Sequence, residues 1–264
     1  MRGLNLWTLK QRIKDIRCPS TIQLLQRIDI YHLSPVDVTW MRMLDGGCSN
    51  ALADQNIRFA NDKFRGQNFA RAKGKLRRSS GTMKSHSFVL QFGQTLERQF
   101  AHRIAQAIDN VTMLDTAGTP RVMTWTNTTS GGGLMYNNHA LEAEAGNATY
   151  GIQVGTGTTA PASDDNAMET LIAHGSAAGQ LQYQATSVGA PGLVGSNIDL
   201  VVCRIFVNGS GGSITLREVG LTMYSADGQA ATNNNPFLLA HDAVNQAIAN
   251  TEVAVVSYVI RTTV

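Results

Sequence analysis

The sequence predicts a mainly β protein: an antiparallel β-sandwich or jelly-roll-like domain, preceded by a long amphipathic helix and a basic, largely helical N-terminal module. Two observations point to this class. From residue 118 onward, short segments rich in β-branched and aromatic residues are bounded by Gly, Pro or Asn, with little helical pattern between them. The chain of 264 residues is also 43% hydrophobic, only 16% charged and contains 25 glycines, as expected for a folded chain with many turns. The predicted division is 1–84 (basic module), 85–117 (helix and linker) and 118–264 (sandwich).

The N-terminal module differs from the rest of the chain in charge. Residues 1–84 hold 16 Lys and Arg against 6 Asp, whereas residues 85–264 hold 6 Arg against 13 Asp and Glu. Such asymmetry suggests two modules with different partners. Apolar residues recur at helical spacing on both sides of Pro19, which predicts two helices. The first contains Leu6, Leu9, Ile13 and Ile16, and the second contains Ile22, Leu25 and Ile28.

A run of cations, RAKGKLRRSS, lies near the end of this module. Its basic side chains could neutralise the phosphates of a nucleic acid. They could equally form an electrostatic tether to an acidic partner, such as the second module of this chain. The sequence leaves both interpretations open for Arg71, Lys73, Lys75, Arg77 and Arg78.

Residues 87–110 show the clearest helical pattern in the chain. Apolar side chains recur every three or four residues, and the opposite face is polar. A stripe of this kind must pack on the downstream sheet or on a copy of itself. The stripe consists of Val89, Phe92, Leu96, Phe100, Ile104 and Ile108.

Seven later segments have the composition of strands. They are residues 121–126, 150–157, 179–188, 197–208, 213–225, 237–244 and 252–264.

Three details of these strands can also be predicted. Glutamines alternate with Leu181 and Tyr183, which is typical of a strand with one wet face. The apolar phase shifts by one residue between Leu216 and Val219, which predicts a β-bulge near Arg217 and Glu218. The sequence NGSGGS at 208–213 predicts a tight hairpin connection.

The segment GIQVGTGTTAPASDDNAMETLIAHG, residues 151–175, combines glycines, carboxylates and a histidine. It lacks the lysine of a P-loop and no helix opens after Gly157, so we interpret Gly155 and Gly157 as a strand end and its turn. The acidic residues lack the spacing and the glycine of a calcium-binding EF-hand loop. We expect a solvated loop with Asp165 or Asn166 capping a short helical turn. The acidic residues and amide concerned are Asp164, Asp165, Asn166 and Glu169.

The histidines give a weak signal for catalysis. His241 precedes Asp242, a pair found in hydrolase triads, but no serine lies in a GxSxG elbow. We expect His174 and His241 to lie at strand ends and to bond the backbone. The three cysteines form no CxxC pair, and no segment is long and apolar enough to span a membrane. We therefore expect no enzymatic activity, no cofactor, no metal ion and no membrane partner.

Residues 83–264 contain a strand ending in VGTG, the sequences TLIAHG and GQLQYQ, and the sequence RIFVNGSGGSITLREVGL. On these motifs the segment resembles a family of structural proteins of tailed bacteriophages and prophages. The helix around FVLQFGQTLERQFA, the LLAHDAV segment and the closing VAVVSYVIRTTV are also similar to it. His241 departs from the family pattern, in which arginine or a similar residue is expected. The family supplies no catalytic pattern.

The resemblance implies a virion component of the tail, neck or baseplate, assembled in the bacterial host cytoplasm from copies of itself and other phage virion proteins. The basic module would contact packaged DNA or an acidic neighbour. Two alternatives are a capsid decoration or DNA-contacting shell protein, and a receptor-binding fibre or adhesin that binds carbohydrate. In the last case Trp125, Tyr136 or Tyr150 would form the sugar platform.

Overall fold

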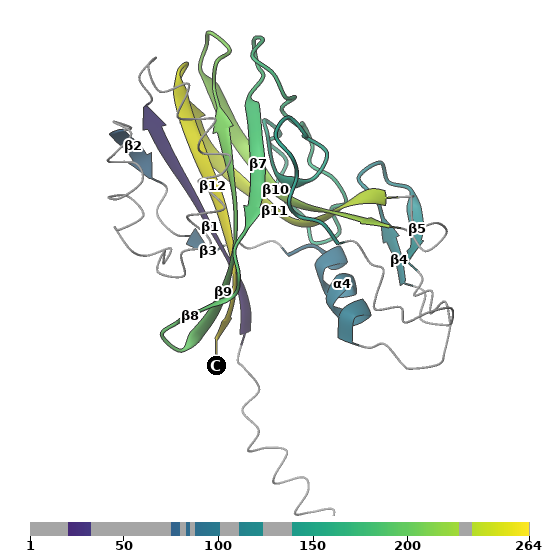
Figure 1. Cartoon of the computed structure of the whole chain (residues 1–264). Coiled ribbons are helices and arrows are strands. Elements are labelled where there is room, and N and C mark those ends of the chain that lie inside the picture. Colours follow the sequence, from purple (N-terminus) through teal and green to yellow (C-terminus); the bar gives the residue numbers. More distant parts are fainter. Residues whose placement is uncertain are drawn as a thin grey trace, which may run out of the picture.

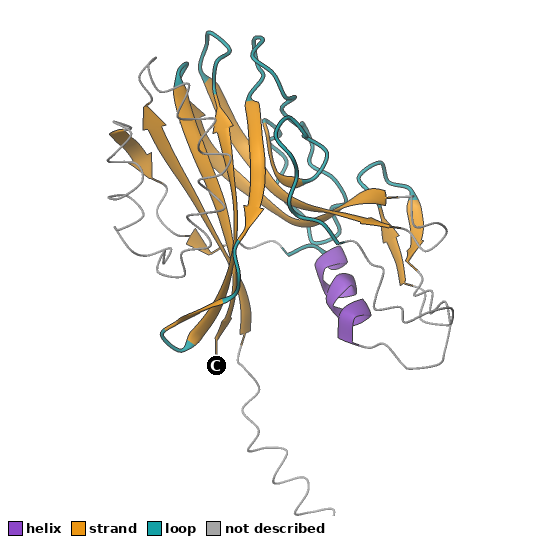
Figure 2. Ribbon diagram, in the orientation of Figure 1, coloured by secondary structure: helices purple, strands orange, loops and turns teal. Residues whose placement is uncertain are grey.

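The computed structural model describes residues 21–32, 75–79, 83–84, 88–100, 111–123, 139–226 and 234–263. This part of the chain is mainly β with antiparallel sheets, as predicted, and it contains a single helix (Figures 1 and 2).

The larger sheet has seven strands in the order β2-β1-β12-β9-β7, with β3 beside β1 and β8 beside β9. Its members come from both ends of the chain, so its middle brings together segments far apart in sequence (Figure 1). They are β1 (Thr21–His32), β2 (Lys75–Ser79), β3 (Met83–Lys84), β7 (Gln182–Val188), β8 (Gly192–Val194), β9 (Asn197–Val207) and β12 (Glu252–Thr263).

A second sheet has three strands in the order β11-β10-β6, and a small third sheet pairs β4 with β5. The helix α4 lies beside β4 and β11 (Figure 1). These elements are α4 (Leu90–Phe100), β4 (Val111–Leu114), β5 (Pro120–Met123), β6 (Gly151–Gly155), β10 (Ile214–Ala226) and β11 (Asn234–Ile248).

The second predicted helix is wrong, because residues 21–32 form strand β1. This strand pairs with β12 along its whole length, from Thr21 opposite Thr263 to His32 opposite Glu252. Leu24, Ile28 and Ile30 enter the core, and residues of the other face are buried as well. Gln26 interrupts the apolar face of this strand, and Leu25 adds an apolar residue to the opposite, mainly polar face. The apolar residues Ile22, Leu25 and Ile28 therefore recur at helical spacing although the segment is a strand. The first predicted helix lies outside the described residues.

Strand β1 also corrects the predicted boundary at residue 84. β1 is paired with β12, and β2 and β3 are paired with β1, so they belong to the same sheet as the C-terminal strands. Residues 21–32, 75–79 and 83–84 are therefore not part of a separate module.

One cluster of buried side chains includes residues from both the seven-stranded sheet and the three-stranded sheet. The larger sheet contributes β1, β7, β9 and β12, and the second sheet contributes β6, β10 and β11. Tyr183, Phe206 and Tyr258 are its bulkiest fully buried apolar members. A second cluster joins β4 and β5 to β10 and β11 through Met113, Met123, Met223, Phe237 and Leu239.

Helix α4 packs on this second cluster through Phe92, which also stacks on Phe88 with ring centroids 3.7 Å apart. Val89 is buried just before the helix begins, as the predicted stripe requires. Leu90, by contrast, is 61% exposed. The part of the stripe beyond Phe100 lies outside the described residues.

Each of the seven predicted strands overlaps an observed strand, although residues 124–126 of the first lie outside the described residues. The predicted bulge is confirmed. The register between β10 and β11 shifts between Leu216 and Glu218, where Arg217 is exposed and Glu218 is buried. The predicted hairpin at 208–213 is wrong, because β9 and β10 belong to different sheets. This tight connection carries the chain from one sheet to the other, since a glycine-rich turn reverses direction without dictating which strands will pair.

Candidate functional site

The bulge in β10 places the carboxylate of Glu218 in a buried site, where it accepts four hydrogen bonds. Three come from backbone N–H groups, at 2.9 Å from Gly157, 2.9 Å from Glu169 and 2.7 Å from Thr170. The fourth partner is Nε2 of His241, 2.9 Å from Oε2 of Glu218. A carboxylate has about four acceptor positions, so this group is saturated by the protein itself.

His241 lies inside β11 and links two carboxylates. Its Nδ1 lies 2.7 Å from Oδ2 of Asp165, and its Nε2 faces Glu218. Burial lowers the pKa of His241, but the two carboxylates outweigh it and hold that pKa above its usual value. Burial raises the pKa of Glu218, but the bonds from His241 and the backbone hold it at about 2. The His241 imidazolium and the Glu218 carboxylate therefore favour each other's charged forms.

This geometry corrects the expectation that His241 lies at a strand end and bonds the backbone. It also separates His241 from Asp242, whose Oδ2 accepts a hydrogen bond from the hydroxyl of Tyr258 at 2.9 Å. Burial and the Asp242 charge raise the pKa of that Tyr258 hydroxyl. His174, in contrast, bonds the backbone as expected, because its Nδ1 accepts the N–H of Tyr183 at 3.1 Å.

The two glycines of the VGTG sequence are required by the approach of Glu218. A Cβ at Gly155 would lie 2.3 Å from Oε1 of Glu218 and 2.5 Å from the carbonyl of Thr170. A Cβ at Gly157 would lie 2.6 Å from the same carboxylate oxygen. Gly155 ends β6 and Gly157 lies in the turn that follows, as expected. The turn therefore does bind an anion, but the anion is the chain's own Glu218.

The acidic loop that follows is tied to the second sheet and contains no helical turn, which corrects the predicted cap. Asp165 accepts the N–H of Ala162 at 2.8 Å while it contacts His241. Glu169 accepts the N–H groups of Thr158 and Thr159 at 2.6 and 2.8 Å, which lower the pKa of this carboxyl. Asp165 and Glu169 thus fix the path of the loop.

Arg204 of β9 is completely buried, and sequence reasoning missed it. Its five N–H donors all reach backbone carbonyls. Nε donates to Gln184, one terminal nitrogen to Tyr150 and Ile152, and the other to Glu144 and Asn147. Burial lowers its pKa to about 10.

The position of Arg204 explains how its charge is tolerated. The guanidinium lies 4.8 Å from the ring centroid of Tyr183, within cation–π distance. Its donors hold the segment 144–152 against β7 and β9. The signal in the sequence was a single Arg within an apolar run, LVVCRIFV.

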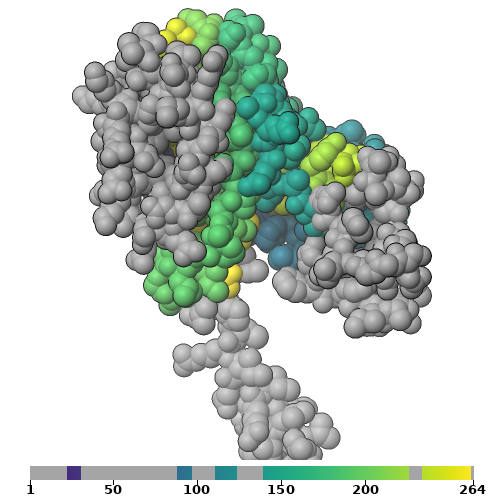
Figure 3. Space-filling view, in the orientation of Figure 1, coloured from purple at the N-terminus to yellow at the C-terminus, as the bar shows by residue number. Residues whose placement is uncertain are grey.

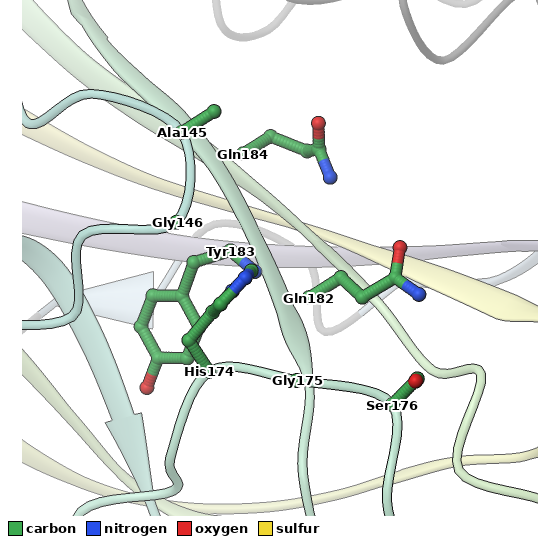
Figure 4. Close-up of a pocket in the computed structure, with 8 residues that line it drawn as sticks. All are labelled: Ala145, Gly146, His174, Gly175, Ser176, Gln182, Tyr183 and Gln184. Carbon is green, nitrogen blue, oxygen red and sulfur yellow. The ribbon is translucent and has the colours of Figure 1, made fainter.

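An open pocket of about 360 Å³ lies where two loops meet β7. One loop contains Ala145 and Gly146, and the other contains His174, Gly175 and Ser176. The glutamines at 182 and 184 face the pocket from the wet side of β7, while Tyr183 between them points into the core, as the alternation predicted (Figure 4). In the space-filling view, the loops before β7 (teal) lie directly beside the green strands (Figure 3).

The predicted contact residues are only partly placed. Arg71 and Lys73 lie outside the described residues. Lys75, Arg77 and Arg78 belong to β2, which stands at one end of the strand order of the larger sheet.

Of the aromatic residues proposed for a carbohydrate platform, Trp125 and Tyr136 lie outside the described residues. The ring of Tyr150 stacks on Tyr224 at 4.8 Å between centroids, with an angle of 11° between the planes.

Among the described residues, no group of three or more His, Cys, Asp or Glu side chains is arranged to hold a metal ion. No helix in the same part of the chain is long and apolar enough to cross a membrane. Comparisons of the chain with protein-family models, with curated proteins and with solved structures found no match.

Proposed function

We propose that this protein is a non-enzymatic structural subunit of a tailed-bacteriophage particle, in the tail, neck or baseplate, that works by homo-oligomeric assembly. One observation supports this role best: the buried charged groups of Glu218 and Arg204 are saturated by the chain itself, Arg204 by backbone carbonyls and Glu218 by backbone N–H groups and His241. A catalytic group needs free capacity for a substrate, whereas these groups hold loops on sheets. Their arrangement suits a rigid building unit.

The finer fold is part of this proposal. Because both larger sheets contribute to one core, we take them as the two layers of a sandwich with jelly-roll-like connections. Three connections, after β6, after β9 and after β11, pass from one of these sheets to the other. Such a unit presents rigid outer faces and edges to neighbouring copies.

An exposed apolar pair offers a contact for assembly. Leu193 in β8 and Ile198 in β9 are opposite each other in the hairpin, and they are 75% and 40% exposed. The hairpin lies at one end of the larger sheet (Figure 1), where β12 pairs with β9 as far as Asn197. Burial of these side chains between copies would favour association.

The decisive experiment measures the mass of the purified full chain by analytical ultracentrifugation and looks for the chain in phage particles by mass spectrometry. Discrete oligomers together with peptides from purified particles are expected. A strictly monomeric chain that is absent from particles would reject the proposal.

A second candidate, contact with packaged DNA, is favoured by the place of β2 at the end of the sheet order. The triple variant Lys75→Ala, Arg77→Ala, Arg78→Ala should then weaken binding to duplex DNA and reduce its salt dependence. Equal binding by the parent and the variant would exclude this contact.

A further inference from the structure

We propose that the pocket beside β7, lined by Ala145, Gly146, His174, Gly175, Ser176, Gln182, Tyr183 and Gln184, binds a neutral saccharide. This inference goes beyond the assembly role and does not rest on it.

The pocket contains side chains with unused hydrogen-bonding capacity. The amides of Gln182 and Gln184 are half-buried, and neither forms a side-chain hydrogen bond with any described residue. The hydroxyl of Ser176 is likewise without a partner in the described part of the chain. In Figure 4 both amides and this hydroxyl extend on the same side of β7. Each amide both donates and accepts, as neighbouring hydroxyl groups of a sugar require.

His174 adds a donor of defined position. Its Nδ1 accepts the N–H of Tyr183, so the neutral ring carries its proton on Nε2. A Cβ at Gly146 would lie 3.6 Å from that Nε2. The glycine therefore leaves open the space beside the donor that a side chain would fill.

Both loops of the pocket are fixed before any ligand binds. The N–H of Gly146 donates to the carbonyl of Tyr183 at 2.9 Å, and the N–H of Gly175 donates to the carbonyl of Leu181 at 3.0 Å. Arg204 holds the first loop from inside through the carbonyls of Glu144 and Asn147. Binding of a ligand would therefore cost little conformational entropy for ordering these loops.

The chemistry of the lining selects the ligand class. None of the eight lining residues is Lys, Arg, Asp or Glu, and the exposed Glu142 and Glu144 precede the pocket in one loop, which disfavours anions such as phosphate. No large apolar side chain is exposed in it, which disfavours lipids.

A peptide added as a strand is also disfavoured. β7 is the last strand in the order of the larger sheet, and loops already pair with its outer edge. Leu181, just before β7, forms a bridge with His174, and the N–H of Thr186 donates to the carbonyl of Ala143. A small neutral polyol, one or two sugar units in size, fits the remaining volume.

The test uses the full chain and a panel of galactose, glucose, mannose and N-acetylglucosamine at millimolar concentration, followed by NMR of the glutamine side-chain amides and by saturation transfer. At least one sugar should shift the amides of Gln182 and Gln184. The double variant Gln182→Ala, Gln184→Ala should weaken its binding roughly tenfold or more. Gln246→Ala, on β11 of the other sheet, is the matched control and should bind as the parent does.

Three results would overturn the assignment: no response to any of the sugars, a response that the double variant retains in full, or saturable binding of inorganic phosphate or of an unrelated peptide at these amides instead. Ser176→Ala gives an independent check, because an exposed hydroxyl can be removed without disturbing the fold. It should also weaken sugar binding, and the thermal midpoints of all variants should match the parent's. If Ser176→Ala binds the sugar as tightly as the parent does, that result would likewise contradict the site.

Discussion

Nε2 of His241 lies 2.9 Å from Oε2 of Glu218, and both side chains are almost completely buried. The pair joins β11 to the bulge of β10, and through Asp165 it also holds the acidic loop on the second sheet. Because the three residues are far apart in the chain, this contact stabilises the tertiary structure and not a local turn.

Loss of the Glu218 carboxylate should destabilise the fold strongly. Glu218→Ala leaves three buried or partly buried N–H donors and His241 without their acceptor, which should lower the free energy of unfolding by about 2–4 kcal/mol. Urea unfolding followed by circular dichroism measures this. Glu144→Gln, on an exposed residue, is the control and should change it by less than about 0.5 kcal/mol. Equal effects of the two changes would contradict the role of Glu218.

The pair also predicts a pH dependence. The pKa of His241 is raised in the folded protein, so its contribution to stability is complete below about pH 6.5 and is lost as pH rises through the folded pKa. The pKa of Glu218 is lowered to about 2, so its contribution is complete above its unfolded value and is lost as pH falls toward 2.

The network is therefore strongest between about pH 4.5 and 6.5. Urea midpoints measured across this range and up to about pH 9 should decline on the alkaline side. In His241→Gln that decline should be smaller. An unchanged slope in the variant would show that His241 does not titrate in this way.

Gly155 should not accept a side chain. In Gly155→Ala the new Cβ would meet both the Glu218 carboxylate and the backbone carbonyl of Thr170, at a cost of about 1–3 kcal/mol. Gly212→Ala is the matched control, because a Cβ there meets nothing within 4 Å. The thermal unfolding midpoints of the two variants provide the comparison. A Gly155→Ala protein as stable as the control would mean that this carboxylate can move away at little cost.

Arg204 should be needed to order the segment 144–152. Arg204→Met keeps most of the side-chain volume but leaves five carbonyls without their donor, which should cost about 3–5 kcal/mol. Hydrogen exchange at Gly146 and Asn147 should become faster. Arg217→Met, on an exposed residue of β10, should leave both quantities nearly unchanged. Slow exchange retained at Gly146 in Arg204→Met would contradict the proposed anchoring.

The β8–β9 hairpin should contribute to self-association. Leu193→Ser together with Ile198→Ser removes the exposed apolar pair and should weaken association roughly tenfold or more without lowering stability. Sedimentation over a range of protein concentrations measures the strength of self-association. Leu171→Ser, at a residue 42% exposed elsewhere, is the control. If the double variant associates like the parent, the contact lies on another surface.

Much of the β architecture could be predicted from local pattern. The composition of the sequence predicts the strands from β6 to β12, except for the short β8. The shift in the apolar alternation at Arg217 predicts the bulge. The pattern failed at β1, because Leu25 and Gln26 interrupt the alternation that marks a strand and leave apolar residues at helical spacing. It also failed at 208–213, where the turn is evident but the pairing of the strands is not.

The sequence by itself determined most of the segments that extend in the C-terminal half, where they turn and where one bulges, since these features depend on side chains a few residues apart. Only the tertiary structure decided the partners of the charged groups. Glu218 meets a turn 61 residues away, and the Arg204 guanidinium reaches a loop 57 residues away. Such contacts depend on how the sheets stack and how the loops close over them, and no short-range pattern encodes that arrangement.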